Sequence, residues 1–164
     1  PQTTDEIMQQ ANYHYYAKRY AKAINMYNEV IDKNSKNTDA LFNRAHSYYI
    51  LGEYELALKD NQAYFEINKN NPQQLVNLSA SYIKSGKFKE GLECAEKAIT
   101  LNSREDDAWF NKACALSLLN DKNGAINALK TSIELNKKNK NTARKDSDFD
   151  NIKDELEFQK LINS

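Results

Sequence analysis

The stretch LFNRAHSYYILGEYELALKDNQAYFEI, residues 41–67, contains two runs of apolar residues at helical spacing, separated by one break. Leu41 and Ala45 belong to the first run, and Ala57 belongs to the second. Gly52 lies in the break, where a glycine can adopt the left-handed conformation that ends a helix. The stretch therefore predicts two helices joined by a tight turn, which is a helical hairpin.

The pattern of this hairpin returns along the chain with a period of about 34 residues. A column of small residues consists of Ala11, Ala45, Ser79 and Ala113. A column of large apolar residues consists of Ile24, Leu58, Leu92 and Ile126. Small side chains let antiparallel helices approach closely, and large ones fill the space beside them. We predict an all-α solenoid forming one domain over 1–164, with hairpins at 4–37, 38–71, 72–105 and 106–139 and a capping segment at 140–164.

Three signals mark the starts of helices. Thr3 with Glu6 forms a capping-box pattern, and Asn71 before Pro72 combines a cap with a first-turn proline. Ser103, three residues before Asp106, is a further candidate for a helix start. All three lie at predicted repeat boundaries.

The third hairpin carries a family resemblance, on the residues Leu75, Leu78, Ser79, Tyr82, Gly86, Phe88, Gly91, Ala95 and Ala98. This pattern resembles the tetratricopeptide repeat, although the proline that ends the family's repeat is absent. The resemblance implies a right-handed superhelix whose first helices line a concave groove that binds other proteins. Residues 146–161 also resemble the closing segment of many bacterial members, which indicates a bacterial source.

Composition argues against several other classes of function. The 23 Lys and Arg residues equal the 23 Asp and Glu residues, so we expect no nucleic-acid partner, and no apolar run is long enough for membrane insertion. The two histidines, His14 and His46, and the separated cysteines form no catalytic or metal-binding motif, so we expect no enzyme activity and no cofactor. We expect a cytoplasmic protein, or a periplasmic or membrane-tethered one if a leader has been removed.

By the resemblance, the groove positions can be read column by column. One column holds a carboxamide in every repeat: Gln9, Asn43, Asn77 and Asn111. A carboxamide both donates and accepts, so such a ladder can hold the backbone of an extended peptide, although Asn is also an ordinary neutral choice for a helix surface. The other candidate groove residues are Asn12, Tyr15, Phe42, His46, Tyr49, Lys84 and Phe110.

A subset of the family clamps the carboxylates of chaperone tails with three cations and two asparagines. The matching positions here are Met8, Asn12, Asn43, Val76 and Ala80, so the cations are missing and this ligand is disfavoured. The sequence predicts a non-catalytic module that binds an extended peptide or a partner protein in its groove. The alternative is a scaffold that self-associates into a homo-oligomer.

Overall fold

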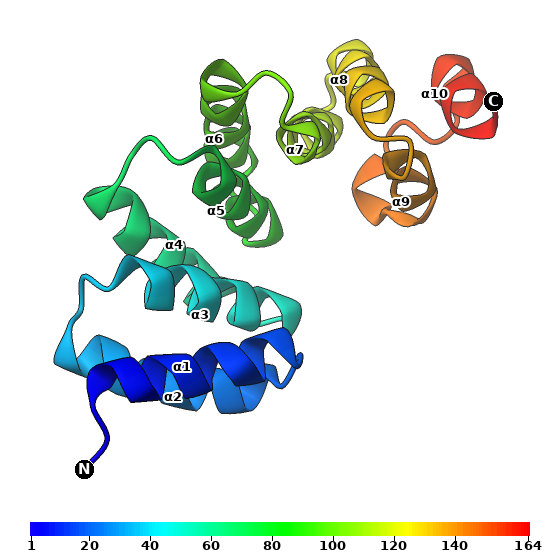
Figure 1. Cartoon of the computed structure of the whole chain (residues 1–164). Helices are drawn as coiled ribbons and strands as arrows, with labels where there is room; N and C mark the ends of the chain where they lie inside the picture. Colours follow the sequence, from blue (N-terminus) through cyan, green and yellow to red (C-terminus); the bar gives the residue numbers. More distant parts are fainter. The chain divides into compact units, whose positions relative to one another are not determined.

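The computed structural model describes residues 1–164 and contains helices only (Figure 1). The first helices of the four hairpins are α1 Thr4–Tyr16, α3 Thr38–Ile50, α5 Pro72–Lys84 and α7 Asp106–Leu118. Their antiparallel partners are α2 Tyr20–Lys33, α4 Tyr54–Ile67, α6 Phe88–Leu101 and α8 Lys122–Leu135. Each first helix begins at the first residue of a predicted repeat, and the all-α prediction is confirmed.

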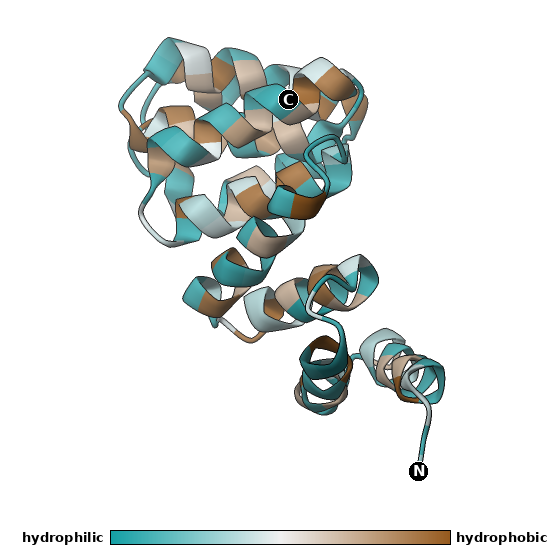
Figure 2. Cartoon of the chain, turned by 90° about the vertical axis from the view of Figure 1, so that its left-hand side faces the viewer, coloured by the Kyte–Doolittle hydropathy of each residue, from teal (hydrophilic) through white to brown (hydrophobic).

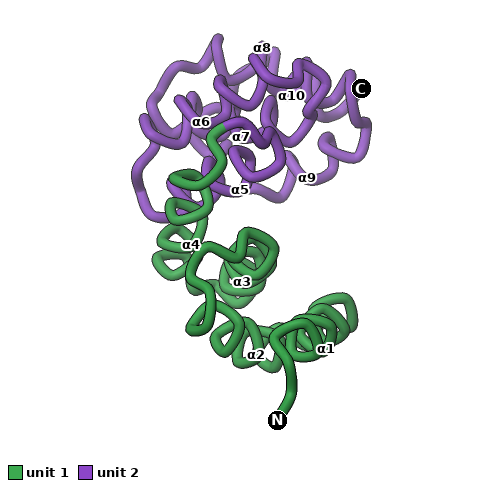
Figure 3. Tube along the Cα trace, turned by 60° about the vertical axis from the view of Figure 1, so that its left-hand side comes forward, with its two compact units in different colours: residues 1–69 green, residues 70–164 purple.

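The chain divides into two compact units, shown in different colours in Figure 3: unit 1, Pro1–Lys69, and unit 2, Asn70–Ser164. Unit 1 contains α1 to α4, and unit 2 contains α5 to α8 with the residues that follow. The boundary falls next to the predicted junction between the second and third repeats. The single domain expected over 1–164 remains a prediction.

The hairpin helices carry both hydrophobic and hydrophilic residues (Figure 2), and the hydrophobic ones supply the buried centre of each unit. In unit 1 the buried centre includes Ile7, Ala11, Ala23 and Tyr27. In unit 2 the buried centre is built from α7, α8 and the residues that follow α8. Leu129 of α8 is one of its fully buried members. None of the helices has the length and apolar character needed to cross a bilayer.

The turns inside the hairpins share one backbone conformation. Gly52 and Gly86 have φ values of 80° and 79°, and Lys18 and Asn120 adopt 59° and 63° in the same column. The left-handed conformation is favourable for glycine, tolerable for asparagine and unfavourable for lysine by about 1 kcal/mol. The turn at Lys18 is therefore imposed by the packing of α1 on α2 rather than by its own sequence.

The capping residues agree with the sequence at two of three positions. Thr3 and Glu6 form the capping box, and Asn71 caps α5 with Pro72 in the first turn. α7 begins at Asp106, as the repeat period predicts, but its N-cap is Glu105 and not Ser103, and the Glu105 side chain makes no capping bond. Ser103 instead accepts a hydrogen bond on its carbonyl from the Trp109 ring, at 2.9 Å.

The residues after the fourth hairpin form α9 Asn139–Lys145, the 3₁₀ turn η1 Ser147–Phe149 and α10 Leu156–Asn163. Phe149, Ile152 and Phe158 are almost completely buried, with 1%, 0% and 3% of their surface exposed. They join the core of α7 and α8, so this segment completes unit 2 rather than trailing from it.

Candidate functional site

Three hydrogen-bonded side chains form the polar centre of unit 1: Asn12 in α1, Tyr27 in α2 and Asn43 in α3. The Tyr27 hydroxyl donates to Asn12 Oδ1 at 2.7 Å, and Asn43 Nδ2 lies 3.2 Å from the same oxygen and 3.1 Å from the hydroxyl. Burial raises the pKa of Tyr27, so the hydroxyl stays protonated and remains a donor. This network fixes both carboxamides, and it leaves the Asn12 N–H groups and the Asn43 carbonyl oxygen uncommitted.

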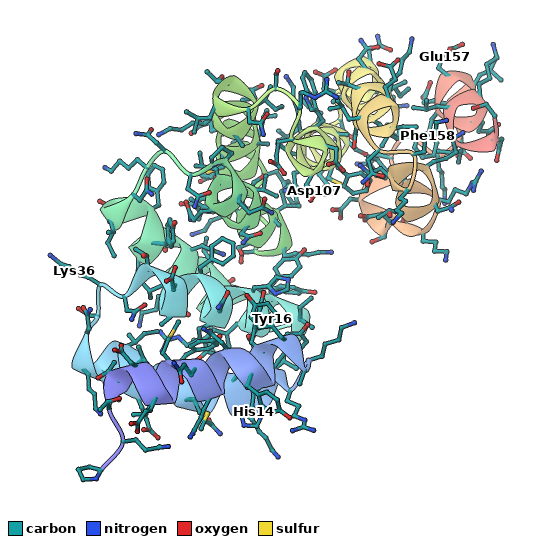
Figure 4. All side chains as sticks on the ribbon, viewed as in Figure 1. His14, Tyr16, Lys36, Asp107, Glu157 and Phe158 are labelled. Carbon is teal, nitrogen blue, oxygen red and sulfur yellow. The ribbon has the colours of Figure 1, made fainter.

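Beside this network, an aromatic cluster joins the ends of α1 and α3. The Tyr15 hydroxyl lies 2.9 Å from His46 Nδ1, and Tyr20 packs edge-on against both rings. Burial lowers the pKa of His46, so at neutral pH the ring is uncharged and can accept the Tyr15 hydrogen bond. Tyr16, labelled in Figure 4, packs edge-on against Tyr15 and remains 77% exposed.

The other predicted residues of unit 1 lie on the same two helices. Gln9 is exposed on α1, and on α3 Phe42 packs against Tyr64 while Tyr49 packs against Tyr54. We call the set Asn12, Tyr15, Phe42, Asn43 and His46 the inner face of unit 1. Asn43 pairs with Asn12 rather than with Gln9, so the two carboxamides that meet come from different columns.

In unit 2 the predicted residues have a different role. Asn77 and Lys84 lie on α5, and Asn111 on α7 donates to the Val76 carbonyl at 3.1 Å. Its amide therefore joins two helices of the unit.

Phe110 on α7 was expected to contact a ligand, but it is only 9% exposed and its ring packs against Phe149, with the ring centroids 5.5 Å apart. In this structure Phe110 is an internal packing residue. The cause is the chain's own C-terminal segment, because Phe149 belongs to the turn that lies on α7.

Sequence reasoning missed a charged network that ties three helices of unit 1 together. Arg44 in α3 makes a bidentate ion pair with the buried Asp60 in α4, at 2.7 Å for each bond, and donates to Asn28 in α2 at 2.9 Å. Burial disfavours the charge of Arg44, but Asp60 more than offsets this, so the pKa of Arg44 is raised. Arg44 and Asp60 lie 16 residues apart, one in each helix of a single hairpin. Opposite charges at this spacing are a sequence signal from which the pair could have been predicted.

Cys114, Asp146 and Asp148 form the one group of potential metal ligands in the molecule. Burial raises the pKa of the Cys114 thiol well above its usual range, and the Asp146 and Asp148 carboxylates add to the effect. Burial therefore keeps the thiol protonated and makes it a poor nucleophile. Asp146 and Asp148 belong to the C-terminal segment, so this group lies where that segment meets α7.

Comparison with known proteins places these features in a family. Tetratricopeptide repeat profiles match residues 8–72 and then 75–105 and 106–139, which together cover most of the chain. A search of curated proteins found no significant match.

Among solved structures, MamA 41-end from Desulfovibrio magneticus RS-1 is 16% identical, with a TM-score of 0.77 over 83% of this chain and 77% of that one. TTC0263, a thermophilic TPR protein of Thermus thermophilus, is 16% identical, with a TM-score of 0.73 over 98% and 86%. YrrB, described as a TPR protein with an unusual peptide-binding site, is 14% identical, with a TM-score of 0.73 over 95% and 82%.

The fold and the matched repeats define an all-α helical-repeat protein. The chain belongs to the tetratricopeptide repeat family, as its repeat pattern predicted. Members of this family generally serve as non-catalytic modules for protein–protein interaction. At 14–16% identity, the likeness to the solved structures concerns the fold alone.

Proposed function

We propose that the chain is a non-catalytic binding module that holds an extended segment of a partner protein against the inner face of unit 1. The observation that carries this proposal is the Asn12–Tyr27–Asn43 network. It immobilises two carboxamides while leaving one donor group and one acceptor uncommitted. A peptide backbone offers one acceptor and one donor per residue, so it complements this pair without regard to its side chains.

The surroundings of the network suit a peptide that also carries apolar side chains. Phe42 on one side and the cluster of Tyr15 and His46 on the other are half-buried, so parts of these rings remain available for contact. Aromatic side chains lose little conformational entropy on binding, and they are enriched at protein interfaces. Because the Asn pair is already fixed, little further ordering is needed when a ligand binds.

The face contains no cation positioned for a carboxylate. Arg44, the nearest arginine in sequence, is committed to Asp60 and Asn28. We therefore propose that an internal segment of the partner binds here, rather than a free C-terminus. A structural neighbour described as having an unusual peptide-binding site fits this proposal.

The test is to select extended peptides of about nine residues from a random display library on the immobilised chain and then measure affinity by fluorescence anisotropy. Asn12→Ala and Asn43→Ala should each weaken binding about tenfold, which corresponds to one hydrogen bond with a buried partner. Asn111→Ala is the matched control. It changes the same column in unit 2, where the amide already bonds to Val76.

Equal losses in Asn43→Ala and Asn111→Ala, or unchanged affinity in both unit 1 variants, would overturn the proposal. The self-association predicted as the alternative would appear as a mass in solution that rises with protein concentration. Peptide selection would then recover no consistent ligand.

A further inference from the structure

In unit 2 a short stretch of the chain without α-helix covers one face of a repeat helix. We call this stretch, residues 146–152, the clasp. It leaves α9, forms the turn η1 and lies on α7. Phe149 is its anchor, because the ring is 1% exposed and packs edge-on against Phe110 at 5.5 Å and 88°. Ile152, which is completely buried, ends the clasp.

Polar contacts hold the clasp through its backbone as well as its side chains. The Ser117 hydroxyl donates to the Asp148 carbonyl at 2.7 Å, and Asn151 Nδ2 donates to the Ser117 carbonyl at 3.0 Å. A buried aromatic anchor and a hydrogen bond to the ligand's main chain are two features of peptide recognition at protein surfaces. The clasp is therefore bound to α7 as a peptide would be.

The covered residues occupy the same columns as the inner face of unit 1. Phe110 and Ser117 on α7 lie 68 residues after Phe42 and Tyr49 on α3. The same side of the repeat that we assign to ligand binding in unit 1 is thus occupied in unit 2. The occupant is a segment of this chain.

Acidic residues of the clasp lie on both sides of the anchor, and a cation lies near one of them. Aspartate precedes Phe149 at position 148 and follows it at position 150. Burial and the Asp146 carboxylate raise the pKa of Asp148, and the Lys84 ammonium opposes this shift. Lys84 lines a surface pocket together with Lys145, Asp146 and Ser147, so a cation from α5 lies beside the acidic part of the clasp.

We propose that the face of α7 formed by Phe110, Cys114 and Ser117 is a recognition site for partner segments that carry an aromatic residue flanked by aspartates, and that the clasp occupies this site until such a segment displaces it. The inference rests on the proposed function, since it takes the inner side of the repeats as the ligand side. A partner segment would reproduce three contacts: a ring against Phe110, a carbonyl at Ser117 and a carboxylate near Lys84.

Covalent attachment gives the clasp a strong advantage over any free competitor. A short tether sets an effective concentration in the millimolar range. A free copy at about 10 micromolar is then outcompeted by roughly a hundredfold or more. A binding experiment must therefore weaken the clasp without changing the face that it covers.

The test uses the full chain and a fluorescent peptide with the sequence of residues 146–158. Phe149→Ala in the chain removes the anchor and leaves Phe110, Cys114 and Ser117 in place. We expect this variant to bind the peptide at least about tenfold more tightly than the unaltered chain, as its own clasp no longer competes effectively. A control peptide carrying Phe149→Ala should not bind, and a peptide carrying Asp148→Lys and Asp150→Lys should bind about tenfold more weakly.

Asn151→Ala provides a second, milder variant, because Asn151 is exposed and loses only its bond to Ser117. If Phe149→Ala fails to fold by circular dichroism, Asn151→Ala decides: a gain in peptide binding over the unaltered chain supports the proposal, and no gain overturns it. Absence of binding by a folded Phe149→Ala chain would also overturn it. A dimer in which two chains exchange clasps would overturn it too, because the occupant would then be a second copy.

Asn43→Ala separates this inference from the proposed function. The substitution lies in unit 1, so the affinity for the 146–158 peptide should stay unchanged. The affinity for the peptides selected on the inner face of unit 1 should fall. The two proposals can therefore fail independently.

Discussion

Units 1 and 2 place different chemistry on equivalent repeat positions. Unit 1 has the hydrogen-bonded side chains Asn12, Tyr27 and Asn43, whereas unit 2 has Ala80, Ala95 and Asn111 at positions 68 residues later. With no polar side chains to meet, Asn111 bonds to the backbone of α5. The small and large columns that pack the hairpins are kept in both units, while several of the polar columns differ.

A second difference concerns charge. The position of Arg44 is taken by Lys112 in unit 2, and that of Asp60 by Ala128. Lys112 pairs at 3.5 Å with Glu96, a largely exposed partner on the neighbouring helix. Unit 1 thus adds a buried charged network to its apolar core, whereas the apolar core of unit 2 includes the clasp. Four predictions test this contrast between the units. The single tryptophan, Trp109, makes tryptophan fluorescence a reporter of unit 2 alone.

The largest expected effect is that of Phe149→Ala on unit 2. Removing a fully buried ring between Phe110 and Phe158 should lower the free energy of unfolding by about 4 kcal/mol. Denaturant unfolding followed by Trp109 fluorescence measures this loss. Leu156→Ala is the control: this side chain is 63% exposed, and its removal should change stability by less than about 0.5 kcal/mol. Equal effects would show that the clasp does not belong to the core.

Asp60→Ala should destabilise unit 1 by about 3 kcal/mol, because the Arg44 side chain is only 16% exposed and its guanidinium would lose its carboxylate partner. The loss should appear in far-ultraviolet circular dichroism, with little change in the Trp109 transition. Glu96→Ala, which breaks the more exposed pair of unit 2, should cost less than about 0.5 kcal/mol. A similar cost for both substitutions would contradict the contrast between the units.

Tyr27→Phe should reduce the stability of unit 1 by about 1 kcal/mol, as it removes one hydroxyl that bonds to both Asn12 and Asn43. The same change should lower the affinity of peptides for the inner face of unit 1, because the Asn12 and Asn43 carboxamides lose their fixed orientation. Tyr16→Phe is the matched control, because Tyr16 is 77% exposed. If both variants behave alike in denaturation, the network does not stabilise unit 1.

The smallest expected effect is a pH dependence from His46. Burial lowers its pKa in the folded state, so the unfolded chain binds more protons as the pH falls below about 6.5, and unit 1 loses stability in that range. For a half-buried ring the loss should be roughly a few tenths of a kcal/mol. The free energy of unfolding is measured at pH 7.5 and 5.5 for the unaltered chain and for His46→Gln. The difference between the two proteins separates the contribution of His46 from that of the carboxylates. A pH dependence that is identical in both proteins would remove His46 as its source.

Much of the fold could be predicted from the repeat columns. The four hairpins, their starting residues and the left-handed turns at Gly52 and Gly86 follow from local pattern and backbone preference. The start of α7 follows from the repeat period and not from a capping side chain, because Glu105 makes no side-chain capping bond and leaves no sequence signal. The candidate site was predicted less completely, since the columns named Asn12 and Asn43 but missed Tyr27, which joins them.

A period of about 34 residues is a property of the chain, and it was enough to predict the family, the all-α class and the helices on which candidate ligand residues lie. Which of those residues make internal contacts depends on the tertiary structure. Phe110 is a core residue because Phe149, 39 positions later in the chain, packs on it. Asn111 is engaged because its side chain donates to the Val76 carbonyl. Such choices depend on contacts between segments distant in sequence, and a repeat pattern contains no information about them.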